Sequence, residues 1–475
     1  MPSLEIAPPP AARRIYNNRT LNLRSIRVIG YDMDYTLIHY RVDEWETRAF
    51  LNARERLVAR GWPVADLEFD PDSVIRGLTI DLEKGNLLKP TRFGYVIRAS
   101  HGSEFLEFDK LRNTYHGVTV DLSDRRWVFL NTLFSLSEAS LYSGLVDRFD
   151  AGVLPEVRSY AELYGIVSTT LDEAHMQGHL KAEILADPKR FIVADPEMPL
   201  TLLDQRHAGK KVVLITNSEW EYTEKMMRFA FDRYLPGELT WRNLFDIIIV
   251  SSAKPEFFTA KRPLYRVVDE GLGLMRPHLG GLDPGIVYVG GSAAQLEHHL
   301  GVSGDEILYV GDHLYSDVSV SKALLRWRTA LVLRELESEI AATEAFRPKE
   351  EQLRVLMDRK ADLEREMAAL RLSRQRAHGG YAEVATPPEV AERLLEELRA
   401  ETAALDEEIT PLAIESGVLR NKAWGPLMRS GNDKSMFARQ VERYADVYTS
   451  RASNFLAATP YGYLRADRGS LPHDV

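Results

Sequence analysis

Short runs of apolar residues recur along the chain, and each is followed by a polar residue or a glycine. Runs of this length without polar alternation are typical of strands that are buried on both faces. The runs that predict strands are Ile26–Tyr31, Lys211–Ile215, Asp246–Val250, Ile307–Val310 and Thr329–Leu333. Helical patterns lie between them, for example over Glu221–Asp232 and Ser316–Leu325. This alternation predicts an α/β fold, a doubly wound parallel sheet with helices on both faces.

The first two predicted strands are much farther apart in the sequence than an ordinary crossover requires. We therefore expect a large cap domain at residues 41–199, inserted into a catalytic core formed by residues 19–40 and 200–347. Residues 1–18, which include three consecutive prolines, are expected to form a flexible lead-in. Residues 413–475 are expected to pack on the core.

The segment between residues 348 and 412 is rich in Glu, Arg, Ala and Leu, unlike the rest of the chain. Leu356, Leu363 and Leu370 are seven residues apart, as in helices that pair along one face. Two consecutive glycines divide the segment, which predicts an antiparallel helical hairpin, a C-terminal arm. An exposed leucine seam usually finds a partner, so we expect a homo-oligomer.

The composition narrows the possible partners. The formal net charge is −10 without any basic run, which argues against a nucleic-acid polymer or a membrane surface as the partner. The chain has no cysteine, which excludes disulfides, cysteine nucleophiles and cysteine-type zinc sites. No apolar stretch approaches the ~20 residues that span a bilayer, and no signal-peptide pattern is present at the start. We therefore expect a cytoplasmic protein.

Candidate chemistry lies where the predicted strands end, because ligands of parallel sheets bind beyond the carboxyl ends of the strands. Asp32 and Asp34, in the string DMDYT, directly follow the first strand. Two carboxylates two positions apart point the same way, so that one can attack and the other can move protons. The alternative interpretation is that they only cap a following helix.

Polar residues also follow the later strands. They are Thr216, Asn217 and Ser218 after the second strand, Lys254 after the third, and Asp312 and Asp317 after the fourth. Hydroxyl, amide and ammonium groups bind the oxygens of a phosphoryl group and neutralise its charge, and carboxylates are ligands that Mg²⁺ prefers. Their placement at successive strand ends predicts a site for a phosphate ester.

These strings resemble a known family. DMDYT, TNS, a lone KP and GDHLYSD, in this order, resemble the four motifs of the haloacid dehalogenase (HAD) superfamily. The longer strings resemble its cytosolic purine 5′-nucleotidase branch, which prefers IMP and GMP; they are YDMDYTLI, GNLLK, NTLF, ITNSEWEYT, WRTALV, NKAWG, RSG, FARQVERYADVY and LPHD. The resemblance begins near residue 18 and reaches the C-terminus, apart from the helical hairpin.

The resemblance implies catalytic roles. Asp32 would be the nucleophile that forms an aspartyl-phosphate, and Asp34 the general acid and later the general base. Thr216 and Lys254 would complete the catalytic residues, and Thr216, Asn217 and Ser218 would bind the substrate phosphate.

The resemblance also implies a Mg²⁺ cofactor. The Asp32 carboxylate, the Asp34 main-chain carbonyl and Asp312 would bind the ion, and Asp317 would hold its waters and Lys254. Four carboxylates and a phosphate dianion converge only with a divalent cation and a lysine among them.

Residues of the expected cap resemble the branch's nucleoside site. Asp172, His175 and Lys181 match its recognition helix, and Phe134 matches its base-stacking aromatic, although a plain core role for Phe134 is equally open. The branch usually has an arginine four residues before the aspartate, where this chain has Ser168. This departure leaves the base preference open.

Together these features predict an enzyme, a 5′-nucleotidase that hydrolyses nucleoside 5′-monophosphates with Mg²⁺. The alternatives are a phosphatase for another small ester, a nucleoside phosphotransferase and, least favoured, a scaffold without catalytic activity.

Overall fold

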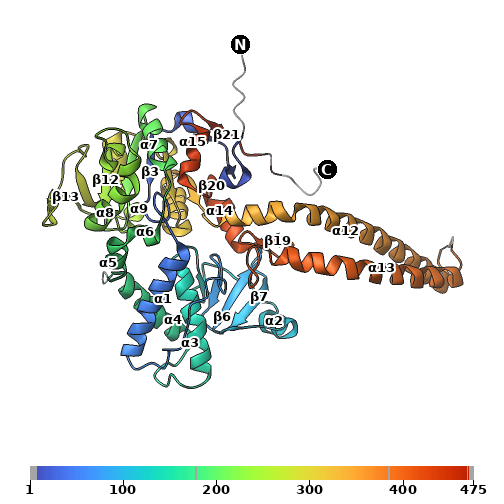
Figure 1. The fold of residues 1–475 in the computed structure, drawn as a ribbon. Coiled ribbons are helices and arrows are strands. Elements are labelled where there is room, and N and C mark those ends of the chain that lie inside the picture. The colour runs from blue at the N-terminus through green and yellow to red at the C-terminus, as the bar shows by residue number, and fades with distance from the viewer. Residues whose placement is uncertain (1–7, 177–178, 383–385, 468, 470–475) are drawn as a thin grey trace, which may run out of the picture. The chain divides into compact units, whose positions relative to one another are not determined.

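The computed structural model describes residues 8–176, 179–382, 386–467 and 469 (Figure 1). The C-terminal string LPHD lies outside these residues. The chain divides into two compact units, which are described separately: residues 1–337 with 427–475, and residues 338–426.

A large sheet forms the core of the first unit. Its described strands run in the order β1 (Ile15–Asn17), β20 (Val447–Thr449), β17 (Arg328–Val332), β16 (Ile307–Gly311), β3 (Val28–Tyr31), β11 (Lys211–Ile215), β12 (Ile247–Val250), β15 (Val287–Gly290), β13 (Leu264–Asp269) and β14 (Leu274–Pro277). The strands from β20 to β15 are parallel, and β1, β13 and β14 are antiparallel to their neighbours. Every residue of β3, β12 and β16 is buried, so both faces of the sheet are covered. The predicted α/β fold with a parallel sheet is confirmed.

Helices connect these strands, as the sequence predicts. They include α7 (Glu197–His207), α8 (Trp220–Phe231), α9 (Glu256–Thr259), α10 (Ala293–Leu300), the π-helical turn η6 (Leu314–Ser319) and α11 (Val320–Leu325). In α8 the buried residues Trp220, Thr223, Met227 and Phe231 recur three or four positions apart. They therefore form one apolar face, which explains why this segment is a helix that packs on the core.

The register of the sheet determines which motifs meet. Strand β3 lies between β16 and β11, and Tyr31 is opposite both Val310 and Leu214. Asp32 N–H then donates to the Val310 carbonyl at 2.9 Å. The residue after β3 therefore lies beside the residues that follow β16 and β11.

The long insertion leaves and re-enters the core through a two-stranded ribbon. The strand β4 (His39–Tyr40) pairs antiparallel with β10 (Ile192–Val193), with Tyr40 opposite Ile192. The insertion has its own sheet in the order β8 (Glu104–Phe105), β7 (Val96–His101), β6 (Asn86–Pro90), β5 (Thr79–Asp81) and β9 (Trp127–Phe129). Its helices are α1 (Val42–Ala59), α2 (Phe108–Tyr115), α3 (Ser135–Asp150), α4 (Tyr160–Met176), α5 (His179–Ala186) and α6 (Pro188–Phe191).

Both ends of the chain contribute to the main sheet. The expected flexible lead-in over residues 1–18 is wrong for residues 15–17, which form the edge strand β1. Their pairing with β20 and the Asn18 N–H bond to the Asp446 carbonyl hold this segment in place. The remaining terminal elements are β2 (Leu21–Asn22), β18 (Arg429–Ser430), β19 (Asp433–Lys434), α14 (Met436–Tyr444), α15 (Phe455–Ala458) and β21 (Tyr463–Leu464).

The second unit contains α12 (Leu336–Gly379), apart from its first two residues, and all of α13 (Pro388–Gly417). Pro348 lies inside α12, so the helix begins well before the composition changes. Leu363 on α12 and Leu395 on α13 are buried at 0% and 2% exposure, and Lys360, which interrupts the heptad pattern, pairs with Asp406 at 2.5 Å. These leucines pack within the hairpin. They are therefore no argument for a homo-oligomer, which stays a prediction.

Among the described residues, no helix has the length and apolar content needed to cross a membrane.

Candidate active site

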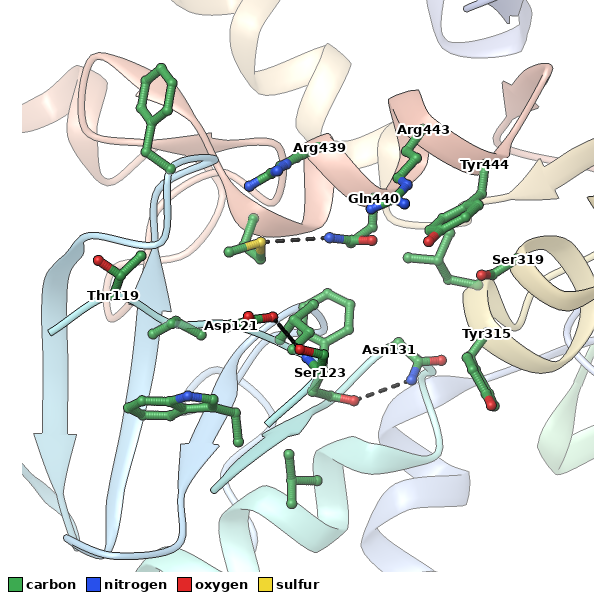
Figure 2. Close-up of a pocket in the computed structure, with 18 residues that line it drawn as sticks. Thr119, Asp121, Ser123, Asn131, Tyr315, Ser319, Arg439, Gln440, Arg443 and Tyr444 are labelled. Carbon is green, nitrogen blue, oxygen red and sulfur yellow. Dashed lines mark hydrogen bonds between the residues drawn. The ribbon is translucent and has the colours of Figure 1, made fainter. Parts of the chain in front are cut away.

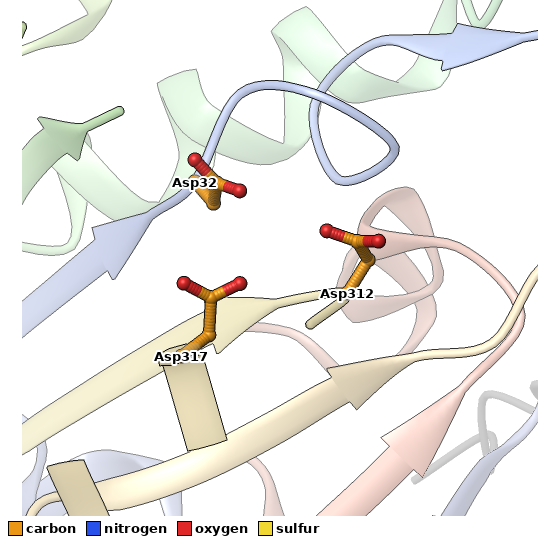
Figure 3. A group of neighbouring side chains, drawn as sticks. All are labelled: Asp32, Asp312 and Asp317. Carbon is orange, nitrogen blue, oxygen red and sulfur yellow. The ribbon is translucent and has the colours of Figure 1, made fainter. Parts of the chain in front are cut away.

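Three aspartates meet at the carboxyl end of the main sheet. Asp32 follows β3, Asp312 follows β16 and Asp317 lies in η6. Each has a carboxylate oxygen within 4.8 Å of the other two, and Figure 3 shows the three side chains facing one another. All three residues are buried. The sequence placed them at two different strand ends, and the order of the strands brings them together.

The DMDYT string forms a tight turn after β3. The N–H groups of Leu37 and Ile38 both donate to the Met33 carbonyl, at 2.9 and 3.0 Å, and Tyr35 has a positive φ of 53°. The first helix after this turn, α1, begins only at Val42. The alternative that these aspartates cap the following helix is therefore excluded by the distance along the chain.

Lys254 is the cation at the centre of this group. Its Nζ lies 2.7 Å from Asp32 Oδ1 and 2.8 Å from Asp317 Oδ1, and it donates to Tyr309 Oη at 3.0 Å. The loop that carries it is held by Asn217, whose amide accepts from Lys254 N–H at 2.7 Å and donates to the Lys254 carbonyl at 3.1 Å. The predicted residue Asn217 thus positions the lysine through its backbone.

The electrostatics follow from burial and from the proximity of these charges. Burial raises the pKa of the Asp32 carboxyl to about 6, although attraction by Lys254 opposes the shift. Burial, followed by repulsion from Asp317 and Asp32, raises the pKa of Asp312 well above its usual value. Burial alone would lower the pKa of Lys254, but Asp317 and Asp32 outweigh it and hold this pKa well above the usual value. One lysine does not balance three buried carboxylates.

The donor set fits a divalent metal ion. Asp312 Oδ2 is buried and has no hydrogen-bond partner among the described residues. A buried carboxylate oxygen in this state is costly unless a cation binds it. Hard oxygen ligands of this kind suit Mg²⁺, with the Asp32 and Asp312 carboxylates as its candidate protein ligands.

Asp34 lies beside this group but has different partners. Tyr40 Oη donates to Asp34 Oδ1 at 2.5 Å, and Ser218 Oγ donates to Asp34 Oδ2 at 2.7 Å. Burial, followed by repulsion from Asp32, raises the pKa of its carboxyl. A carboxyl group that holds its proton more tightly suits general acid catalysis. Thr216 is fully buried, and its hydroxyl accepts from Ser218 N–H at 3.1 Å, which shapes the turn after β11.

The predicted cap residues differ in how near they lie to the aspartates. Lys181 is close, because its Nζ lies 2.6 Å from Glu219 Oε2 and 4.9 Å from the centre of the Tyr222 ring. Phe134 packs edge-on against Tyr35 of the DMDYT turn, with ring centres 4.8 Å apart. Phe134, which directly precedes α3, therefore lies against the DMDYT turn, and Lys181 of α5 lies against the start of α8.

Asp172 and Ser168 lie on α4. Asp172 has an exposed surface, but neighbouring protein atoms partly desolvate its carboxyl and raise its pKa. Burial raises the pKa of the Glu138 carboxyl, and the nearby hydroxyls of Tyr164 and Ser168 oppose this rise. The backbone of His175 belongs to α4, but its side chain lies outside the described residues, so its role stays a prediction.

A separate cavity of about 800 Å³ lies next to η6 (Figure 2). Its lining includes Asn131 from the NTLF string, Tyr315 from η6, and Gln440 and Tyr444 from α14. In the same wall, Asp121 accepts hydrogen bonds from Ser123 (Figure 2). The aspartates that follow β3 and β16 are not among the described residues that line it.

Some residues of the site are not predicted by the sequence. Tyr40 and Arg76 are examples: Arg76 is buried, donates to the Asp312 carbonyl at 3.2 Å and pairs with Glu335 at 2.6 Å. A lone arginine far from the motifs carries no sequence signal of its own. Only the chain path through the insertion brings Arg76 to the end of β16.

Comparison with known proteins identifies the family. The sequence matches the 5′ nucleotidase family over residues 15–475. The chain is 30% identical over 461 residues to 5′-nucleotidase domain-containing protein 2 of Homo sapiens, covering 94% of this chain and 82% of that protein. The protein of the same name from Rattus norvegicus is 29% identical over 461 residues, covering 94% of this chain and 77% of that protein.

Solved structures with a detectable likeness are more distant. An archaeal beta-phosphoglucomutase from Pyrococcus sp. strain ST 04 is 12% identical with a TM-score of 0.32, covering 65% of this chain and 86% of that one. A predicted phosphoglycolate phosphatase from Haemophilus somnus is 13% identical with a TM-score of 0.28, covering 65% and 85%. Similarity this low has no bearing on the chemistry, whereas the match over nearly the whole sequence is decisive. The chain belongs to the 5′ nucleotidase family, as its motifs predict.

Proposed function

We propose that this protein hydrolyses nucleoside 5′-monophosphates with Mg²⁺, through an aspartyl-phosphate formed on Asp32. The observation that carries the proposal is the Asp32 carboxylate, which is paired with Lys254 and lies within 4.8 Å of the Asp312 and Asp317 carboxylates. A nucleophilic carboxylate needs a charge environment that accepts an incoming phosphate, and a divalent cation with a buried lysine supplies it.

The first half-reaction transfers the phosphoryl group to the protein. An Asp32 oxygen forms a bond to phosphorus while the bond from phosphorus to the 5′-oxygen breaks. Asp34 gives its proton to the departing 5′-oxygen, so the nucleoside leaves as an alcohol. Lys254, together with Thr216 and the backbone of the TNS turn, would bind the phosphoryl oxygens.

The second half-reaction restores the protein. A water molecule attacks phosphorus, gives one proton to Asp34, and the bond from phosphorus to Asp32 breaks. Inorganic phosphate leaves and both aspartates return to their starting states. The Asp32 and Asp312 carboxylates and the Asp34 carbonyl would bind Mg²⁺, which when bound neutralises charge on the phosphate. Asp317 keeps Lys254 in place through their contact at 2.8 Å.

The nucleoside end would be bound by the insertion. Phe134 offers a ring for stacking on the base, and Asp172, His175 and Lys181 are the candidate polar contacts. The proposed preference for purine 6-oxo nucleotides rests on the resemblance alone. Ser168, which stands where the branch usually has arginine, lies near the Glu138 carboxylate and supplies no charged donor to a base.

A substrate panel tests the proposal. Phosphate release from IMP, GMP, AMP and CMP is compared with release from sugar phosphates, each with Mg²⁺ and with EDTA. Release from the nucleotides that EDTA abolishes supports the proposal. Preferential release from the sugar phosphates would instead identify a phosphatase for another ester. Adding a second nucleoside distinguishes hydrolysis from phosphoryl transfer, because a transferase would form the new nucleotide in place of phosphate.

A further inference from the structure

Tyr40 connects the proposed proton-transfer group to the ribbon between the core and the insertion. Its Oη donates to Asp34 Oδ1 at 2.5 Å. Tyr40 lies on β4, and its cross-strand partner Ile192 on β10 brings the chain back from the insertion. The Tyr40 side chain is buried at 2% exposure, which shields this hydrogen bond from bulk solvent. A residue of the ribbon therefore touches the catalytic carboxyl group directly.

A second tyrosine supports the first one. Tyr222 Oη lies 3.1 Å from Tyr40 Oη, so one hydroxyl donates to the other. Tyr222 is on α8 of the core, and the ammonium of Lys181 from α5 lies over its ring at 4.9 Å. Lys181 is in turn paired with Glu219 at 2.6 Å. Contacts thus run without a break from the insertion to Asp34.

The ring of Tyr40 has little freedom to move. It packs against Trp45 with ring centres 4.4 Å apart and against Tyr35 with ring centres 5.2 Å apart. The terminal torsion of an aspartate is soft, so its carboxyl plane turns unless donors hold it. Asp34 has a donor on each oxygen, Tyr40 on Oδ1 and Ser218 on Oδ2. If Ser218 turns to the substrate phosphate, Tyr40 is the remaining hydroxyl that fixes the plane.

We propose that Tyr40 is a positioning residue that aims Asp34 at the leaving oxygen, and that Tyr222 keeps Tyr40 in place. This inference rests on the proposed function and adds a residue to it. Oδ1 of Asp34 stays bound by Tyr40, and Oδ2 carries the proton that is transferred. The bond from Oδ2 to hydrogen breaks as the ester bond to phosphorus breaks, and the attacking water later returns one proton to Asp34.

A comparison of two phosphate esters as substrates distinguishes a loss of Asp34 positioning from a general loss of activity. The 5′-alkoxide of IMP is a strongly basic leaving group and needs a proton, whereas p-nitrophenolate leaves as a stable anion and needs little help. The variants Tyr40→Phe and Tyr222→Phe remove one hydroxyl each. The matched control is Tyr288→Phe, because Tyr288 on β15 is also buried and its hydroxyl accepts from Asp283 N–H at 2.8 Å, away from Asp34.

The measurements are steady-state phosphate release from IMP with Mg²⁺ and the rapid first release of p-nitrophenolate. We expect Tyr40→Phe to lower kcat on IMP about ten- to a hundredfold with KM changed less than about threefold. The first p-nitrophenolate release should change less than about threefold. Tyr222→Phe should lower kcat on IMP by a smaller factor, about two- to tenfold, and Tyr288→Phe should leave both rates unchanged.

Negative results for the variants and for the unmodified protein lead to different conclusions. An unchanged kcat on IMP in Tyr40→Phe, or an equal loss on both esters, would overturn the inference. If Tyr40→Phe does not fold, Tyr222→Phe decides: an IMP-selective loss supports the inference, and no loss overturns it. If the unmodified protein releases no phosphate from IMP or the other nucleotides, the proposed function itself fails, and the positioning role falls with it.

Discussion

Lys254 Nζ lies 2.7 Å from Asp32 Oδ1, a contact between two buried side chains that follow different strands of the main sheet. Lys254 comes after β12 and Asp32 after β3, and β11 lies between these two strands. The two residues are far apart in the sequence. They come into contact because the parallel strands of the sheet align their carboxyl ends. The same ammonium reaches Asp317, so a single cation holds two carboxylates.

Removing that cation should damage both stability and catalysis. Lys254→Met leaves buried carboxylates unpaired, which typically costs about 3–5 kcal/mol of unfolding free energy. We expect a lower melting temperature, partly restored by Mg²⁺, and a loss of phosphate release of about a hundredfold or more. Calorimetric melting with and without Mg²⁺ and a phosphate assay measure these effects.

The control for this variant is Lys211→Met, which removes a half-exposed lysine paired with Asp246 on the same sheet. Surface pairs of this kind contribute about 0–1 kcal/mol, so its stability and turnover should stay close to those of the unmodified protein. Wild-type turnover in Lys254→Met would contradict the assigned role of this lysine.

Base selectivity should depend on Ser168. Serine has no guanidinium, so Ser168 lacks the charged fork with which an arginine reads a purine carbonyl oxygen. The absence of such a hydrogen bond typically weakens the interaction with the base by about 1.5–3 kcal/mol. We expect activity on IMP and GMP with weak discrimination against AMP and CMP, and Ser168→Arg should sharpen it by about ten- to a hundredfold in kcat/KM.

Ser168→Ala is the matched variant, because it removes the hydroxyl without adding a charge, and it should leave the selectivity ratio nearly unchanged. Steady-state kinetics on the four monophosphates measure the ratio. A tight 6-oxo preference in the unmodified protein would show that another residue has taken over the arginine's role.

The sequence predicted the strands of the main sheet well, because a short apolar run is a local signal. The apolar runs correspond to β3, β11, β12, β16 and β17, and Asp32 and Lys254 follow two of them. The prediction of a flexible lead-in is wrong for residues 15–17, because a strand of three residues at a sheet edge has too little pattern to be detected. Its pairing with β20 depends on residues more than four hundred positions later, which only the fold brings near.

The residues that support the site could not be predicted from the sequence for the same reason. Tyr40 contacts Asp34 because the ribbon folds back over the DMDYT turn, and Arg76 contacts the Asp312 carbonyl because the insertion returns to the core. The sequence alone shows Ser168 as a departure from the branch, whereas its position near Glu138 depends on the fold. Motifs indicate the reacting groups, whereas long-range packing determines what holds them.

His39 should make the protein sensitive to acid. Burial, and then the positive charges of Arg334, Arg451 and Arg13, lower the pKa of His39 to about 3. The unfolded chain binds a proton on this residue near pH 6.5, whereas the folded protein does so only near pH 3. The unfolded state therefore gains protons first as the pH falls, and the free energy of unfolding should decrease between about pH 6.5 and 3, by up to ~1.4 kcal/mol per pH unit.

The variant His39→Gln should reduce this slope, and His207→Gln, at an exposed histidine on α7, serves as the control. Urea unfolding at several pH values between 4 and 7 gives the slope in each variant. An equal slope in His39→Gln and the unmodified protein would show that other groups cause the acid sensitivity.

The helical arm should be dispensable for the chemistry. We expect replacement of about residues 348–412 by a short Gly-rich linker to leave phosphate release largely intact, because the four motifs lie before residue 325. Because Leu363 and Leu395 are buried within the hairpin, removing the hairpin should leave the number of subunits per particle unchanged. Light scattering measures this number, and a change after deletion would show that another face of the arm binds a partner.

Asp32→Asn should abolish turnover while it keeps the shape of the side chain. The amide is a poor nucleophile, so phosphate release should fall by roughly 10³ or more. The matched variant Asp246→Asn changes a carboxylate at the start of β12, where Asp246 Oδ2 accepts from Val212 N–H at 3.0 Å, and it should keep most of the activity. If Asp32→Asn kept a tenth of the unmodified turnover, covalent catalysis by Asp32 would be wrong.

The most direct test is to find the phosphoryl group on the protein. Asp34→Asn removes the base that activates water, while p-nitrophenyl phosphate needs little acid, so this variant should accumulate the intermediate. The variant is mixed with p-nitrophenyl phosphate and Mg²⁺, quenched in acid, digested and analysed by mass spectrometry. We expect one phosphoryl group on the peptide that contains Asp32, in an amount matching the first release of p-nitrophenolate. Release of p-nitrophenolate with that peptide unmodified, or with the phosphoryl group on another residue, would contradict it.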